Sequence, residues 1–204
     1  MELQNKVARA LLEIEAVQIK TDGYFTWTSG IQSPIYCDNR LTMSYPEIRT
    51  QIAKAFAEKL VELNMTPDVI AGCATAGIPH AAWLADELNV PMAYVRSKPK
   101  GHGKGNQIEG KVEIGQKVLV IEDLISTGGS SIDAANVLRE EGADVLGVFA
   151  IFTYGLQKAV DRFKQEDLFM DTITNFDHLL DVLREDGKIN SEDTSRLLKW
   201  RDQL

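Results

Sequence analysis

The sequence predicts an α/β fold with a mainly parallel central sheet flanked by helices, and three observations carry this prediction. Continuous apolar runs, which are typical of strands buried on both faces, occur at 68–73 (DVIAGC), 117–121 (KVLVI) and 144–152 (DVLGVFAIF). Segments of helical length and spacing separate these runs. The chain of 204 residues is long enough for one domain with a substantial core, or for one domain with a small appended lobe.

The composition excludes several classes of protein. There are 30 acidic residues against 22 Lys and Arg, giving a net charge of −8, so we expect no nucleic-acid partner. No apolar run approaches the length of a membrane span, and we expect no membrane partner. Residues 1–20 lack the apolar region of a signal peptide, and Cys37 and Cys73 match no zinc or CxxC spacing. We therefore expect a cytoplasmic protein without a dedicated metal-binding cluster.

The first quarter of the chain predicts helix, then strands and turns, then helix. Apolar residues at helical spacing predict an amphipathic helix over 3–19. The stretch 21–42 mixes aromatic and β-branched residues with Gly and Pro, which favours short twisted strands. A second helix is predicted from Pro46 to about Asn64, with Ser44 and Glu47 forming a capping box.

The later elements alternate between helix and strand. A helix is predicted from Gly77 to about Asn89, followed by a strand at 91–95 (PMAYV). Residues 97–107 contain no apolar side chain and predict a loop within the domain. The next predicted helix ends near Glu141, with Gly142 as its C′ residue. Two or three helical segments and a short strand at 168–173 (LFMDTI) are expected to complete the chain.

The stretch 118–131 (VLVIEDLISTGGSS) carries the most chemistry. Glu122 and Asp123 come at the carboxyl end of the strand predicted at 117–121, where open α/β sheets bind ligands. The turn that follows, 126–130, combines glycines and hydroxyls and opens onto a helix, a combination suited to binding phosphate. Two carboxylates facing a phosphate would repel it, whereas they can accept hydrogen bonds from sugar hydroxyls. The spacing therefore suggests a ribose 5-phosphate site, with an ordinary strand–turn–helix as the alternative.

Three blocks resemble the orotate phosphoribosyltransferases, a branch of the type I phosphoribosyltransferases, over nearly the whole chain. They are 25–40 (FTWTSGIQSPIYCDNR), 96–110 (RSKPKGHGKGNQIEG) and 121–131 (IEDLISTGGSS). The third block is shared by many phosphoribosyltransferases, whereas the second is close to diagnostic of the orotate branch. The resemblance implies the type I phosphoribosyltransferase fold in a single domain, 1–204, with a small N-terminal hood formed mainly by 1–42 and a catalytic lid loop at 97–107.

By resemblance, the chain transfers the phosphoribosyl group of 5-phosphoribosyl 1-diphosphate (PRPP) to orotate, with Mg²⁺ on the pyrophosphate and ribose oxygens. The implied catalytic residues are Lys100, His102 and Asp123. The implied PRPP-binding residues are Arg96, Lys100, His102, Glu122, Asp123, Leu124, Ile125, Ser126, Thr127, Gly128, Gly129 and Ser130. Backbone groups of the turn 74–77 are a further, weaker candidate for binding pyrophosphate. The lid is expected to reach a neighbouring subunit, which implies a homodimer.

The orotate site follows less completely from the resemblance. Ser126, Tyr36 and Arg40 are the implied orotate-binding residues. Many family members have a lysine where this chain has Thr28 and an arginine where it has Tyr154. The group that binds the orotate carboxylate therefore stays open, with Arg40 the nearest candidate in the hood.

Two other functions compete with orotate transfer. One is transfer to a purine base, which the block at 96–110 disfavours because purine-using relatives vary there. The other is a PRPP-sensing regulator without catalysis, which would be expected to carry an added nucleic-acid-binding module or a basic face. The chain has neither spare length nor positive charge for that role.

Overall fold

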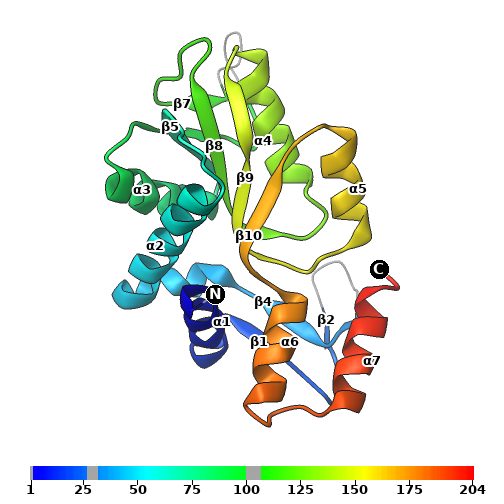
Figure 1. Ribbon diagram of the computed structural model, residues 1–204. Coiled ribbons are helices and arrows are strands. Elements are labelled where there is room, and N and C mark those ends of the chain that lie inside the picture. The colour runs from blue at the N-terminus through cyan, green and yellow to red at the C-terminus, as the bar shows by residue number, and fades with distance from the viewer. Residues whose placement is uncertain (1, 27–31, 100–106) are drawn as a thin grey trace.

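A computed structural model describes residues 2–26, 32–99 and 107–204 of the chain. Its centre is a six-stranded sheet in the order β10-β9-β8-β5-β6-β7 (Figure 1). All neighbouring strands run parallel except β6 and β7 at one edge. The predicted mainly parallel sheet is confirmed. Its strands are β5 (Val69–Cys73), β6 (Met92–Val95), β7 (Ile108–Glu109), β8 (Lys117–Ile125), β9 (Asp144–Thr153) and β10 (Met170–Asn175).

Helices cover both faces of this sheet and enclose two apolar cores. One core joins the sheet to α1 (Glu2–Glu13), α2 (Pro46–Glu62), α3 (Gly77–Leu88), α6 (Phe176–Glu185) and α7 (Ser191–Arg201). The other core joins it to α4 (Gly129–Glu140) and α5 (Gln157–Gln165). In Figure 1, α2 and α3 lie to the left of the sheet, and α4 and α5 lie to its right. Among the described residues, no helix is long and apolar enough to span a membrane.

The N-terminal segment forms small strand pairs near the carboxyl ends of the sheet strands. Strand β1 (Val17–Ile19) pairs antiparallel with β4 (Ile35–Cys37), and β2 (Phe25–Thr26) pairs with β3 (Gln32–Ser33). A 3₁₀ helix, η1 (Asn39–Ser44), leads into α2. In Figure 1 the lower ends of β8, β9 and β10 point toward β1 and β4.

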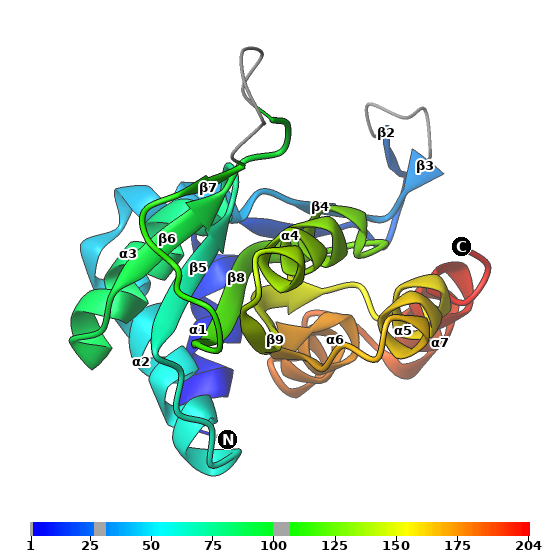
Figure 2. The ribbon, with the colours of Figure 1, turned by 90° about the horizontal axis from the view of Figure 1, so that it is seen from above.

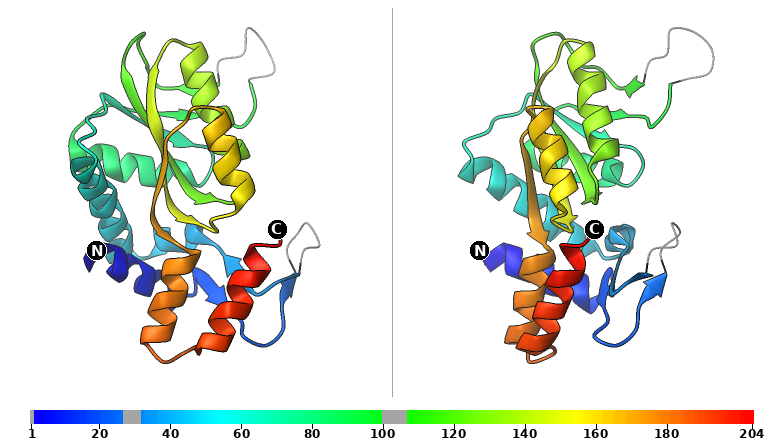
Figure 3. Two further views of the ribbon diagram at one scale, coloured as in Figure 1. Left: turned by 45° about the vertical axis from the view of Figure 1, so that its right-hand side comes forward. Right: turned by 90° about the vertical axis from the view of Figure 1, so that its right-hand side faces the viewer.

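The last helix, α7 (Ser191–Arg201), lies against this N-terminal segment. The Trp200 indole N–H donates to the Gln32 carbonyl oxygen at 3.2 Å, and the Arg196 guanidinium donates to the Thr21 carbonyl oxygen. Figure 3 shows α6 and α7 beside the strands of the N-terminal segment. The two ends of the chain therefore support one another.

Two predictions near the N-terminus are wrong. The helix predicted over 3–19 ends at Glu13, because Glu15 adopts a φ of +59° and Val17–Ile19 forms β1 instead. Residues 17–19 form a strand because they pair with β4, and the helical spacing of their apolar side chains does not indicate this pairing. The capping box is also absent: Tyr45 is the N-cap of α2 without a side-chain hydrogen bond, and Ser44 belongs to η1. Pro46 does occupy the first turn, as predicted.

Two strand boundaries also differ from the prediction. The strand expected at 117–121 continues to Ile125, because β9 pairs with it as far as Ile125 and Thr153. Glu122 and Asp123 therefore lie inside β8 rather than after it. The strand expected at 168–173 begins at Met170 and ends at Asn175, in register with β9.

Candidate active site

The predicted functional segments meet at one edge of the sheet. Strand β5 lies between β6 and β8 and runs parallel to both, so their carboxyl ends share that edge. The turn 74–76 follows β5, Arg96 follows β6, and the turn 126–128 follows β8. The Ala74 N–H donates to the Val95 carbonyl at 3.0 Å, which ties the first two segments together. In Figures 2 and 3 the ends of β6 and β7 and the β2–β3 pair lie on the same side of the molecule.

Residues 126–130, which we call the phosphate turn, follow β8 and include the first two residues of α4. Gly128 is the N-cap with a φ of +78°, and the helix begins at Gly129. The first N–H groups of a helix have no intrahelical partner and carry positive partial charge, so they suit an anion. The glycine turn that opens onto a helix agrees with the sequence, whereas phosphate binding by this turn stays a prediction.

The phosphate turn packs closely on α5, which the sequence did not reveal. Arg162 donates from its Nη1 atom to the Thr127 carbonyl oxygen at 3.1 Å. A Cβ at Gly128 would lie 2.6 Å from the Phe163 ring, and one at Gly129 would lie 3.3 Å from the Arg162 guanidinium. Glycine at these positions therefore permits both the left-handed backbone at Gly128 and the contact with α5.

The two acids of β8 stay in contact with one another and also have separate neighbours. A hydrogen bond between their side chains acts on the pKa of both carboxyl groups. Glu122 also reaches the first turn of α4, whereas Asp123 also lies near Arg40 of the N-terminal segment. The structure therefore keeps the two carboxylates together, as the sequence predicts.

Glu122 is turned toward the phosphate turn. Its carboxylate accepts hydrogen bonds from the Ser130 hydroxyl at 3.1 Å and from the Asp123 backbone N–H at 3.0 Å. The side chain is buried, and burial raises the pKa of Glu122 to about 7, with a further contribution from Asp123. Glu122 therefore connects β8 to the first turn of α4.

Asp123 lies on the side of the N-terminal segment. Burial raises the pKa of its carboxyl group, whereas a hydrogen bond with the Glu122 side chain and, to a smaller extent, the positive charge of Arg40 act in the opposite direction. Asp123 in turn helps to raise the pKa of the Cys37 thiol and of the Tyr154 hydroxyl, for both of which burial is the main cause. The Asn39 amide donates to the Asp123 carbonyl oxygen at 2.7 Å. Asp123 is thus tied to the start of η1.

The predicted orotate-binding residues Tyr36 and Arg40 belong to β4 and η1. The hydrogen bond from Asn39 to the Asp123 carbonyl oxygen ties this segment to β8. Arg40 is paired with Asp38 through two hydrogen bonds, at 2.6 and 2.8 Å, and is largely exposed. The structure therefore brings the segment of Tyr36 and Arg40 to β8, while Thr28 lies outside the described residues.

Two further segments border the site. The turn after β5 contains a cis peptide between Ala74 and Thr75. A Cβ at Gly77 would lie 2.2 Å from the Ile121 carbonyl oxygen, so α3 begins in close contact with β8. Arg96 exchanges backbone and side-chain hydrogen bonds with Gln107, at 2.8 and 3.1 Å, at the base of the predicted lid. The predicted catalytic residues Lys100 and His102 lie outside the described residues.

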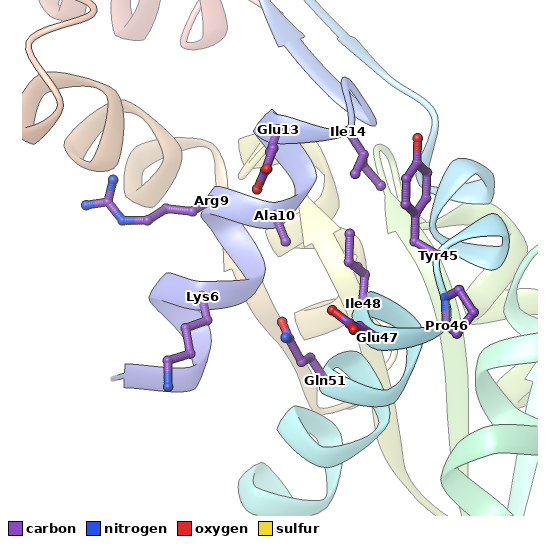
Figure 4. Close-up of a pocket in the computed structure, with 10 residues that line it drawn as sticks. All are labelled: Lys6, Arg9, Ala10, Glu13, Ile14, Tyr45, Pro46, Glu47, Ile48 and Gln51. Atoms are coloured by element: carbon purple, nitrogen blue, oxygen red, sulfur yellow. The ribbon is translucent and has the colours of Figure 1, made fainter.

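No predicted site residue lines a cavity of about 640 Å³ between α1 and the start of α2 (Figure 4). Its walls include Lys6 and Arg9 on one side and Ile48 and Gln51 on the other. Within 2–26, 32–99 and 107–204, no group of three or more His, Cys, Asp or Glu side chains could hold a metal ion. The acids of β8 are thus not part of a larger ligand cluster in those ranges.

Comparison with known proteins defines the class. The model of the phosphoribosyl transferase domain matches residues 44–180. The orotate phosphoribosyltransferase of Oceanobacillus iheyensis is 59% identical over 202 residues, covering 99% of this chain and 100% of that protein. The one from Staphylococcus haemolyticus is 54% identical with the same coverage.

Solved structures agree with this class. Orotate phosphoribosyltransferase from Aeropyrum pernix has a TM-score of 0.76 at 28% identity, covering 90% of this chain and 99% of that one. Leishmania donovani UMP synthase has a TM-score of 0.79 at 29% identity, covering 98% of this chain and 42% of that one. The sheet and its flanking helices thus form the type I phosphoribosyltransferase fold. The chain belongs to the orotate phosphoribosyltransferase family.

Proposed function

We infer that this protein transfers the 5-phosphoribosyl group from PRPP to orotate, giving orotidine 5′-monophosphate and pyrophosphate in pyrimidine biosynthesis. The observation that carries this conclusion is the near-complete match, at 59% identity, to an orotate phosphoribosyltransferase. The acids of β8 and the phosphate turn, which stand where open α/β sheets bind ligands, support it.

The reaction breaks the bond between C1 of the ribose and the pyrophosphate oxygen. Positive charge develops on the sugar and negative charge on the leaving group, so preorganised groups of opposite charge accelerate the step. We propose that Asp123 faces the developing cation and a ribose hydroxyl, and that Glu122 binds the sugar from the side of the phosphate turn. The backbone N–H groups and hydroxyls of residues 126–130, including the intervening Thr127, Gly128 and Gly129, hold the 5-phosphate.

The leaving group needs positive charge from elsewhere. Arg96 follows β6 at the base of the lid, and we propose that it acts together with Lys100 and His102 of the lid. Mg²⁺ arriving with PRPP would supply charge neutralisation of the leaving group, and such a cation would need few protein ligands. A closed lid would exclude water from the activated sugar.

Orotate is proposed to bind between the N-terminal segment and the phosphate turn, near Tyr36, Arg40 and Ser126. The hydrogen bond from Asn39 to the Asp123 carbonyl oxygen, which ties the segment of Tyr36 and Arg40 to β8, supports this position. A homodimer with lids shared between subunits and a cytoplasmic location both stay predictions. The proposed division into a hood at 1–42 and a lid at 97–107 has the same standing.

The test is an assay of pyrophosphate release by the purified protein with PRPP, Mg²⁺ and one base at a time. We expect release with orotate and not with adenine, guanine or hypoxanthine. Preference for a purine base would contradict the assignment in favour of purine transfer. No pyrophosphate release with any base, together with binding of PRPP, would indicate a regulator.

A further inference from the structure

The end of β8, which contains Asp123, is paired with a strand on one side only. Strand β5 pairs with β8 as far as Ile121, whereas β9 pairs with it as far as Ile125. Both backbone groups of Asp123 bond to side chains instead of a second strand. Its N–H donates to the Glu122 carboxylate at 3.0 Å, and its carbonyl oxygen accepts from the Asn39 amide at 2.7 Å.

Asn39 is itself held between two elements. It begins η1, it is 1% exposed, and its carbonyl oxygen accepts from the Thr42 hydroxyl at 2.6 Å. The Thr42 hydroxyl lies 3.4 Å from the Nε2 atom of His80 in α3, and both of these side chains are buried. Asn39, Thr42 and His80 thus form a buried polar chain from α3 to η1, and the Asn39 amide at its end bonds to Asp123.

The two bonds to the backbone of Asp123 differ in what they fix. Glu122 is the preceding residue of β8 and moves with the strand, whereas Asn39 is 84 residues away in the sequence. The Asn39 bond therefore anchors the end of β8 to a separate part of the chain. A buried carbonyl oxygen that lost this donor would be left without a partner, so the bond is costly to break.

We propose that Asn39 is a positioning residue for phosphoribosyl transfer, whose side-chain amide holds the backbone of Asp123 and thereby fixes the Asp123 carboxylate against the ribose. This inference rests on the proposed function of the site. A carboxylate that faces developing positive charge contributes to the rate only when it is held in the productive geometry. Because Asn39 is buried, it acts through Asp123 and does not itself contact a substrate.

The first test measures kcat and KM for PRPP in wild type, Asn39→Ala, Asn39→Leu and the control Asn190→Ala. Leucine removes the donor without leaving the volume empty. Asn190 makes the same kind of contact, from one side chain to one backbone group, as the N-cap of α7, and losing it should lower stability by about 1 kcal/mol.

We expect both Asn39 variants to lower kcat about tenfold, the equivalent of one ordinary hydrogen bond. The KM for PRPP should change by less than about threefold, because the phosphate turn keeps its own contacts. Asn190→Ala should leave both constants unchanged. Normal kcat in Asn39→Leu would overturn the inference, and so would an equal fall of kcat in Asn190→Ala.

A double-mutant cycle tests whether Asn39 acts through Asp123. In Asp123→Asn the carboxylate to be positioned is gone, so adding Asn39→Leu should lower kcat by less than about twofold. A further tenfold loss would assign Asn39 a general structural role and contradict the inference. If neither Asn39 variant folds, Thr42→Val decides, because it removes the bond to the Asn39 carbonyl. It should lower kcat without raising the KM for PRPP, and normal kcat would contradict the inference.

Hydrogen exchange tests the anchor without turnover. The backbone amides of 122–125 should exchange faster in Asn39→Leu than in Asn190→Ala, because the end of β8 opens more readily without its anchor. Equal exchange in the two variants would contradict the inference. Absence of orotate-dependent turnover in wild type would contradict the proposed function alone, since exchange still reports whether Asn39 holds Asp123.

Discussion

Substitution of Gly128 by alanine tests the packing of the phosphate turn. Gly128 has a φ of +78°, and a Cβ there would lie 2.6 Å from the Phe163 ring of α5. The left-handed backbone costs a non-glycine residue about 1–2 kcal/mol, partly offset because alanine restricts the unfolded chain. Overpacking against the ring adds about 1–3 kcal/mol. We therefore expect Gly128→Ala to lower the free energy of unfolding by about 2–4 kcal/mol.

Gly115 offers a matched control for this experiment. It has a similar φ, +81°, but its Cβ would meet nothing within 4 Å. Gly115→Ala should therefore report the backbone cost alone, about 1 kcal/mol. Urea denaturation measures both variants, and the difference between them isolates the contact with Phe163. Adding Phe163→Leu to Gly128→Ala should recover part of the loss, because the two residues are in contact.

The same substitution should weaken PRPP binding. A turn displaced from α5 no longer presents its N–H groups in one arrangement, and a loss of about tenfold in affinity corresponds to about 1.4 kcal/mol. Titration calorimetry measures this affinity, with Gly115→Ala again as the control. Equal stability of the two alanine variants, with unchanged PRPP affinity in both, would refute the idea that contact with Phe163 shapes the turn.

Three other predictions concern single side chains. Because burial raises the pKa of Glu122 to about 7, folding is stabilised while Glu122 is protonated, and the stability of wild type should fall as pH rises from about 4.5 to 7. Glu122→Gln should reduce that fall in urea denaturation at pH 5 and 8; an unchanged difference between the two pH values would contradict it. Burial lowers the pKa of His80 from 6.5 to about 4, so stability should fall as pH drops through that range, and His80→Leu should remove the fall, as thermal melts can check. Lys100→Ala should reduce kcat far more than PRPP affinity in steady-state kinetics, whereas weaker binding with normal kcat would contradict a transition-state role.

The sequence predicted the sheet well because a parallel strand buried on both faces consists of consecutive apolar residues. The runs that form β5, β8 and β9 can therefore be recognised without information about the strands beside them. The ends of α3 and α4 were also predicted from local residues, and Asn89 and Gly142 adopt a positive φ there. By contrast, Val17–Ile19 continues the helical spacing of α1, and only its pairing with β4 makes it a strand.

The site was predicted in outline but not in its internal arrangement. The acids and the glycine turn are adjacent in the sequence and therefore recognisable. The position of the acids inside β8 rather than after it depends on the length of β8, which pairing with β9 sets. Arg162 and Asn39 were missed because their partners lie 35 and 84 residues away in the sequence. Nothing in the sequence near either residue indicates those contacts.

The most direct test of the central claim is a crystal structure of the protein with PRPP bound. We expect the 5-phosphate to accept hydrogen bonds from backbone N–H groups of the phosphate turn, and a ribose hydroxyl to donate to Asp123. A well-ordered PRPP molecule bound elsewhere, with the phosphate turn empty and the carboxylate of Asp123 directed away from the sugar, would contradict it.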